Sequence, residues 1–343
     1  MVMVGNRLKL IRQANALSLQ DLSELLADSE LPVGKGALSH YEMGITVPSR
    51  EAIKVLSKRL GTTEGFFDLP DWSDIDFTLF TPSKTQTAKS ITQMLAFVQI
   101  QLEKYLYVEA LLNSHKDVEF PAKIRITKDN QSVVEDFAEE IRKKYDLGSA
   151  PISSVSNTLE QAGWKTIEME SLNGYVSGYE HTSKTPFLIY PSLFVVDDFR
   201  FDLLTSIGYA YLEGESERDT REIVERFARA MLLPRRQVEF EFGGPRDVVS
   251  ISELTLIKQK YGISKRQVMK RLLELNFIER EYFDSFEDLM RLHGFPRRKQ
   301  ILAETVQFFE NPVTVPMKVL EAQSRGLITQ EKVDSLLLIK HMT

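Results

Sequence analysis

The stretch of sequence that decides the fold of the N-terminal part is residues 17–49, LSLQDLSELLADSELPVGKGALSHYEMGITVPS. Its apolar residues recur three and four positions apart with polar residues between them, which is the spacing of short amphipathic helices. Ser18 is a favourable N-cap residue, Asp21 lies in the first turn of the helix that follows, and Gly44 suits the position after a helix end. Residues 5–67 are therefore predicted to form a string of short helices.

The composition limits the classes of protein to which the chain can belong. The chain has 343 residues, of which 43% are hydrophobic and 27% are charged, so two or three folded domains are expected. The sequence contains no run of about 18 apolar residues, so a membrane-spanning helix is not expected. The start of the chain lacks the features of a signal peptide, so a cytoplasmic protein is expected.

The residues that bind metals are scarce in this sequence. There is no cysteine, which excludes disulfides, thiolate zinc sites, iron–sulfur clusters and cysteine nucleophiles. The five histidines lie far apart in the sequence, so no local pair of them can hold a metal. The net charge of −6 gives no global sign of a nucleic-acid partner, and any such sign must be local.

The rest of the chain is predicted to be mainly α with an α+β part. Residues 68–84 have the composition of a linker, and residues 86–113 form one long amphipathic helix whose stripe packs within the chain or against a second copy. Alternating apolar and polar residues predict three strands, at 164–169, 175–179 and 186–190. Further helices are predicted at 132–145, 151–162, 199–213, 216–233, within 249–277, and in the tail to residue 343.

Residues 5–69 resemble the Cro/cI-type (XRE-family) helix-turn-helix domain. The matching residues follow the order and spacing of the family and are Gly5-Asn6-Arg7-Leu8, Arg12, Leu17-Ser18, Asp21-Leu22, Val33, Leu38-Ser39, Tyr41-Glu42, Gly44 and Pro48-Ser49. The resemblance implies that the third helix, residues 35–43, enters the major groove of DNA. It also implies that Glu42 pairs with Arg12 inside the domain. The turn between the second and third helices, residues 27–32, is longer than is usual in the family.

This resemblance implies a set of DNA-contacting residues. Lys35 can contact guanine or a phosphate, Ser39 can contact any base, and Ala37 can pack on a thymine methyl group. Each of these side chains could instead belong to a solvated helix face, and Tyr41 could equally belong to the core. The full predicted set is Ser18, Gln20, Lys35, Gly36, Ala37, Ser39, His40 and Tyr41.

The charge of the N-terminal segment bears on how it would bind DNA. Residues 1–70 contain eight lysine and arginine residues and eight aspartate and glutamate residues, so their net charge is zero. The affinity for DNA that one copy gains from the release of counterions should therefore be modest. Two copies on a palindromic operator, and hence a homodimer, are expected.

Residues 119–245 resemble the ImmA/IrrE family, whose domain is a metallopeptidase-like zincin fold. The matching residues are Val118-Glu119-Phe120-Pro121, Val134, Phe137-Ala138-Glu139-Glu140-Ile141-Arg142, Pro151-Ile152, Leu159-Glu160, Gly163, Arg200-Phe201-Asp202-Leu203-Leu204, Arg226-Phe227-Ala228 and Met231-Leu232-Leu233-Pro234. Active members carry His-Glu-x-x-His after the Arg-Phe pair. Here the two ligand positions hold Thr205 and Tyr209, and the general-base position holds Ser206.

These replacements predict a pseudo-peptidase with no catalytic residue, metal or cofactor. Threonine and neutral tyrosine are poor zinc ligands, and serine cannot replace a carboxylate base near neutral pH. Ile223 occupies the expected third ligand position, between Glu222 and Glu225. The former cleft would bind a peptide, a small effector or another protein, or be filled by Tyr209 and Tyr211.

Two charged clusters remain. Asp197, Asp198 and Asp202 are expected to form a solvated helix start rather than a cation site. Residues 246–275 contain seven basic and three acidic residues, a net charge of +4, around a Gly-Ile-Ser turn that resembles a second helix-turn-helix unit. A structural role for this basic segment is favoured over contact with DNA phosphate.

Together these features predict a cytoplasmic, sequence-specific DNA-binding regulator, a repressor rather than an activator, with an inactive zincin-like domain as sensor or interaction module. The predicted parts are residues 1–70 (DNA-binding domain), 71–118 (linker and long helix), 119–245 (pseudo-peptidase domain) and 246–343 (C-terminal helical region). Two alternatives stay open. One is an active zinc endopeptidase that cleaves a partner regulator, and the other is an antitoxin-like protein with autoregulatory DNA binding.

Overall fold

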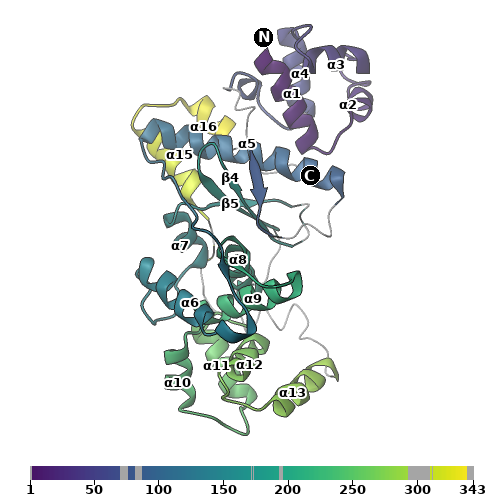
Figure 1. Ribbon diagram of the computed structural model, residues 1–343. Coiled ribbons are helices and arrows are strands. Elements are labelled where there is room, and N and C mark those ends of the chain that lie inside the picture. The colour runs from purple at the N-terminus through teal and green to yellow at the C-terminus, as the bar shows by residue number, and fades with distance from the viewer. Residues whose placement is uncertain are drawn as a thin grey trace.

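The computed structural model describes residues 2–69, 76–81, 87–170, 172, 174–192, 196–292, 310 and 312–337. The protein is mainly helical with a small mixed sheet, as the sequence predicts, and its elements form an elongated molecule (Figure 1). The N-terminal helices lie at one end and helices α10 to α13 at the other, with the sheet between them. None of the described helices has the length and apolarity needed to cross a membrane.

The N-terminal part contains four short helices and a 3-10 turn, as predicted. They are α1 (Val2–Ala14), α2 (Leu19–Leu25), α3 (Lys35–Glu42), α4 (Arg50–Arg59) and η1 (Glu64–Phe66). Ser18 caps α2 in a capping box with Asp21, and Gly44 follows α3 with a φ of 69°. Gly5 allows close packing of α1 on the end of α3, because a Cβ there would lie 2.3 Å from the carbonyl oxygen of Tyr41.

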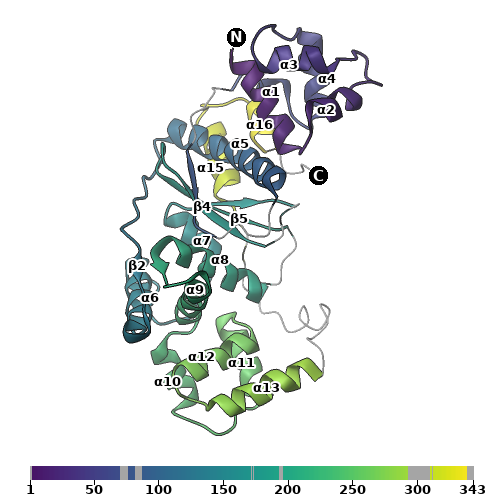
Figure 2. The same ribbon diagram turned by 45° about the vertical axis from the view of Figure 1, so that its right-hand side comes forward.

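Helix α5 (Ala88–Leu112) is the long helix predicted from the sequence, and it packs within the chain. It lies between α1 on one side and the sheet with α15 (Thr314–Ser324) on the other (Figure 2). Val98 and Leu102, two residues of its apolar stripe, are fully buried by these neighbours. The stripe that favoured a dimer helix is therefore occupied by intramolecular contacts.

The sheet has four strands in the order β1-β4-β5-β3. Strand β3 (Lys165–Glu168) runs parallel to β5 (Thr185–Tyr190), whereas β4 (Val176–Glu180) is antiparallel to β5 and to β1 (Phe77–Leu79). The prediction of a linker over residues 68–84 is wrong at β1. Three residues are too short for a periodic signal, and β1 is held by pairing with β4 and by the ring of Phe77 on that of Phe187, 5.5 Å away.

A second apolar core extends from the sheet to the far end of the molecule. Its helices include α10, which starts directly after Pro234 and was not predicted from the sequence. The elements of this part are β2 (Ile124–Arg125), η2 (Lys128–Asn130), α6 (Val133–Lys144), α7 (Val155–Gln161), α8 (Val196–Tyr211), β6 (Leu212–Glu213), α9 (Glu217–Leu232), α10 (Arg235–Phe242), α11 (Ile251–Tyr261), α12 (Lys265–Glu274) and α13 (Arg280–Leu292).

The C-terminal helices do not join this second core. Helices α15 and α16 (Gln330–Leu337) pack on α5 through a small apolar cluster that contains Val108, Val319 and Leu336. Ahead of them, buried Glu310 accepts hydrogen bonds from the first backbone amides of α7 and pairs with Arg200. The predicted region 246–343 is thus divided between two cores, and its residues 293–309, 311 and 338–343 lie outside the described residues.

Candidate nucleic-acid interface and degenerate metal site

Helix α3 presents a small exposed face, which we call the recognition face and define as Lys35, Gly36, Ala37, Ser39 and His40. All of these residues are exposed except Ser39, which is partly buried. Leu38, on the opposite side of the helix, is fully buried in the N-terminal core, as is Val33 ahead of the helix. This anchoring fixes which side of α3 faces solvent.

Two ion pairs hold the helices behind the recognition face. Arg12 donates to both carboxylate oxygens of Glu42 at 2.5 and 2.8 Å, which confirms the predicted pair. Arg7 is buried, pairs with Glu103 of α5 and lies over the ring of Phe66. Two of the eight lysine and arginine residues in the segment 1–70 are thus committed to internal pairs, so fewer of them are available at the surface than the sequence count suggests.

The other residues predicted to contact DNA are less accessible than those of the recognition face. The Ser18 hydroxyl accepts a hydrogen bond from the Asp21 amide, and the Gln20 amide donates to Glu24 at 2.8 Å. Tyr41 is partly buried and packs against the N-terminal core. The structure therefore brings the α3 residues together on one face and gives Ser18 and Tyr41 structural contacts.

The degenerate metal-site residues lie on α8 and are built into its packing. The Thr205 hydroxyl donates to the carbonyl oxygen of Phe201 at 2.9 Å. Ser206 is 3% exposed, and its carbonyl oxygen accepts a hydrogen bond from the Ser177 hydroxyl of β4 at 2.7 Å. Burial raises the pKa of Tyr209, and a hydrogen bond with Arg221 opposes this shift. Ser206 and Tyr209 thus contact neighbouring elements, whereas the hydrogen bond of Thr205 lies within α8.

Helix α9 packs closely on α8 beside the residues predicted to replace the metal ligands. A Cβ on Gly208 would lie 2.9 Å from the Cβ of Val224, so only glycine fits there without displacement. The side chain of Tyr211 is buried, with its ring 5.1 Å from that of Phe120 and 5.4 Å from that of Phe137. Tyr211 thus fills the core, as one of the two interpretations predicted.

The carboxylates near the third ligand position have other partners. Glu222 is exposed and pairs with Arg218, whereas Glu225 lies 3.5 Å from Arg229 and 3.3 Å from Lys270. In the described part of the chain, no group of three histidine, aspartate or glutamate residues is placed to hold a metal ion.

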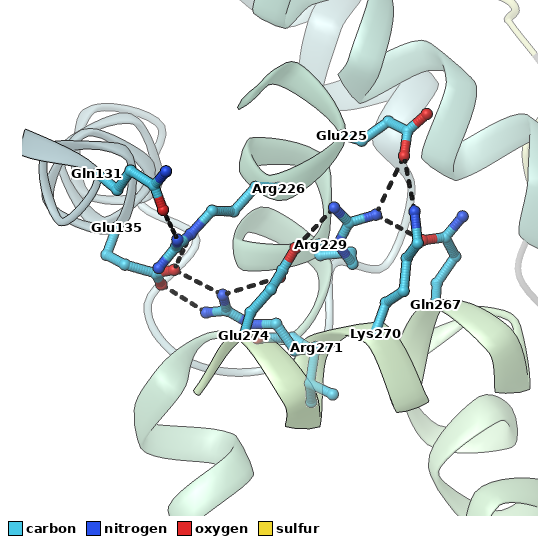
Figure 3. Close-up of polar contacts among 10 residues, drawn as sticks. Gln131, Glu135, Glu225, Arg226, Arg229, Gln267, Lys270, Arg271 and Glu274 are labelled. Carbon is cyan, nitrogen blue, oxygen red and sulfur yellow. Dashed lines mark hydrogen bonds and ion pairs between the residues drawn. The ribbon is translucent and has the colours of Figure 1, made fainter. Parts of the chain in front are cut away.

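A polar cleft of about 690 Å³, which the sequence did not predict, lies between α6, α9, α12 and α13. Three of its cationic side chains, those of Arg226, Arg229 and Lys270, lie beside carboxylates, as Figure 3 shows. Arg226 donates to Glu135 at 3.1 Å, and Arg229 lies 2.7 Å from Glu274. The fully buried Arg271, on α12 behind the cleft, donates to both oxygens of Glu135 at 2.7 and 2.6 Å.

The basic segment 246–275 has the structural role that was favoured from the sequence. Arg271 also donates to the carbonyl oxygen of Leu233, so it joins α12 to α6 and to the end of α9. Five more of the seven cations have carboxylate partners, in the pairs Arg246–Glu253, Lys258–Asp197, Lys260–Glu241, Arg266–Glu287 and Lys270–Glu225.

The acidic cluster at the start of α8 differs from its prediction. Asp197 is 2% exposed and lies 3.0 Å from Lys258 of α11, so it is a buried ion-pair partner and not part of a solvated helix start. Burial, with the nearby charges of Asp198 and Glu225, raises the pKa of the partly buried Asp202 to about 7. The prediction failed because α11, more than 50 residues away in the sequence, covers the start of α8.

Comparison with known proteins adds no relative. A scan against protein-family models, a search of curated proteins and a search of solved structures each found no match to this chain.

Proposed function

We propose that this protein is a sequence-specific DNA-binding transcriptional regulator of the cytoplasm that acts as a repressor. The observation that carries the proposal is the exposed recognition face on a helix anchored by Leu38 and by the Arg12–Glu42 pair. A helix held in this way, with small residues and one lysine at its start, can enter a major groove closely and donate to base edges.

The test begins with selection of bound sequences from random duplex DNA by the purified protein. On the selected site, the double variant Lys35→Ala and Ser39→Ala should lose most of its affinity, since removal of each base contact costs about 1–3 kcal/mol. Its melting temperature should stay unchanged, because both side chains face away from the core. Lys58→Ala, which removes an exposed lysine of α4, is the matched control. Equal binding by the double variant and the wild type would contradict the proposal.

The proposed regulator binds a palindromic operator as a homodimer. The charge of residues 1–70 supports this. Outside the ion pairs Arg7–Glu103 and Arg12–Glu42, six cations and seven acids of this segment remain, so one copy has little attraction for phosphate. Since α5 is buried within the chain, the two copies would meet through another surface. Light scattering that shows a 39.3 kDa monomer both alone and with the selected DNA would exclude the dimer.

The zincin-like part is proposed to be an inactive peptidase that serves as a sensor or interaction module. The packing roles of Thr205, Ser206 and Tyr209 support this, since none of them is a zinc ligand or a general base of the required kind. Elemental analysis of the purified protein should find far less than one zinc per chain. Stoichiometric zinc that is lost in Glu222→Ala would instead support the zinc endopeptidase.

A further inference from the structure

A second cleft, of about 350 Å³, lies between α5, the edge of the sheet at β3, and the C-terminal helices α15 and α16. Its walls combine polar and apolar groups, and the apolar residues include Phe97 of α5, Val315 and Pro316 of α15, and Leu336 of α16. Figures 1 and 2 both show α15 and α16 beside α5, so the cleft joins segments that are more than 200 residues apart. Its volume is in the range of small-molecule sites in proteins.

One cationic side chain of α5 lines this cleft. Lys104 is 5% exposed, and its amine has no hydrogen bond or ion pair with any residue that the structure describes. Burial lowers the pKa of Lys104 to about 7. Lys165 offers a direct comparison, because it is buried to the same degree but lies 2.5 Å from the carboxylate of Glu109. An ammonium group buried without an anion is costly, and a neighbouring anion offsets part of that cost.

None of the titratable groups that the structure describes near the cleft pairs with Lys104. Glu168 lines the cleft but is exposed, and the hydroxyl of Tyr105 donates to the carbonyl oxygen of Thr166. Lys318 of α15 pairs with Glu109, and Glu103 is turned toward Arg7. A bound anion beside Lys104 would therefore complete the site.

We propose that this cleft binds a small monocarboxylic acid with an apolar body, whose carboxylate pairs with Lys104 and whose body contacts Phe97, Val315 and Leu336. The single amine favours one carboxylate over a phosphate group, since a phosphate is best held by several charged donors and the described lining of the cleft contains no arginine. The apolar side chains of the lining would hold the rest of the molecule through the hydrophobic effect.

The position of the site connects it to the N-terminal helices. Lys104 follows Glu103, whose carboxylate forms the buried pair with Arg7 of α1. A ligand that changes the packing of α15 and α16 on α5 would act on the same helix that holds α1. An effect on DNA binding rests on the proposed function, whereas the ligand site itself does not, so its test uses the full chain without DNA.

The test compares carboxylates with neutral analogues at pH 7. Hexanoate and phenylacetate should raise the melting temperature and bind in calorimetry, and hexanamide and phenylacetamide should not. Lys104→Met should lose at least tenfold in carboxylate affinity, while Lys89→Met, at an exposed position of the same helix, should bind as the wild type does. A wild-type protein that responds to neither acid, or equal affinity in Lys104→Met, overturns the proposal.

A second measurement keeps the test decisive if Lys104→Met does not fold. Reductive methylation with ¹³C labels each lysine while preserving its charge, so the titration of Lys104 can be followed by NMR. Saturating hexanoate should raise the titration midpoint of the Lys104 signal by at least one pH unit, a tenfold effect, because the bound carboxylate favours the ammonium form. An unchanged midpoint overturns the proposal.

Discussion

Helices α3 and α12 both begin with a lysine, but they use their charges in opposite ways. Helix α12 lies in the basic segment 246–275, and three of its cations, Arg266, Lys270 and Arg271, pair with carboxylates of α13, α9 and α6. Helix α3 lies in a segment with no net charge and leaves Lys35 exposed. The comparison shows that a count of charges along the sequence does not predict the surface charge, because the acids that neutralise cations of α12 lie on helices distant in the sequence.

The largest expected effect is at Arg271 of α12. Arg271→Ala should lower the free energy of unfolding by about 3–5 kcal/mol, since removal of one partner leaves the mostly buried Glu135 with a reduced set of donors. Urea unfolding followed by circular dichroism measures this loss. The result would show that the charge of α12 is used for stability.

The control for this prediction is another arginine of the same helix. Arg266 pairs with Glu287 at 2.8 Å but is 45% exposed, so Arg266→Ala should cost less than about 1 kcal/mol. Equal losses in the free energy of unfolding of the two variants would contradict this comparison, because they would show that burial does not decide the role of a cation on α12.

A smaller effect is expected at the Arg271–Glu135 pair, in the dependence of the free energy of unfolding on acid pH. Burial alone would raise the pKa of Glu135, but its hydrogen bonds and the charges of Arg271 and Arg226 outweigh burial and lower it. The stability from this group is fully present above pH 4.5, its unfolded value, and is lost as the pH falls through the lower folded pKa. The wild type should lose stability in this window through the protonation of Glu135. Glu135→Gln should lack that part of the acid dependence, and an unchanged slope would contradict the assignment.

Much of the fold could be predicted from the sequence because its helices carry clear end signals. The predicted helices 86–113, 132–145 and 216–233 agree with α5, α6 and α9 to within two residues at each end. Strand β1 and helix α10 were missed for a physical reason. Each is short, and each is stabilised by packing against elements whose positions the local pattern does not contain.

The candidate functional residues likewise divide into those that the sequence predicts and those that it does not. The exposure of Lys35 and the pairing of Arg12 with Glu42 followed from a local motif, and the structure has both. Lys104 could not be found from the sequence, because a lysine in a long amphipathic helix has the pattern of a solvated face. Its burial depends on the sheet and on α15, which lie from 60 to more than 200 residues away along the chain.

The smallest effects concern DNA binding and compare the two helices directly. If Lys35 holds a phosphate, Lys35→Gln should lower the slope of log affinity against log salt by about 0.9 for each phosphate that the lysine neutralises. Lys270→Gln on α12 should leave the slope unchanged and the affinity within about twofold, because Lys270 is paired with Glu225 and should not reach a phosphate. Fluorescence anisotropy with the selected duplex between 50 and 200 mM salt, a range of about fourfold, measures both. A steeper loss in Lys270→Gln than in Lys35→Gln would reverse the comparison and place the DNA-facing charge on α12.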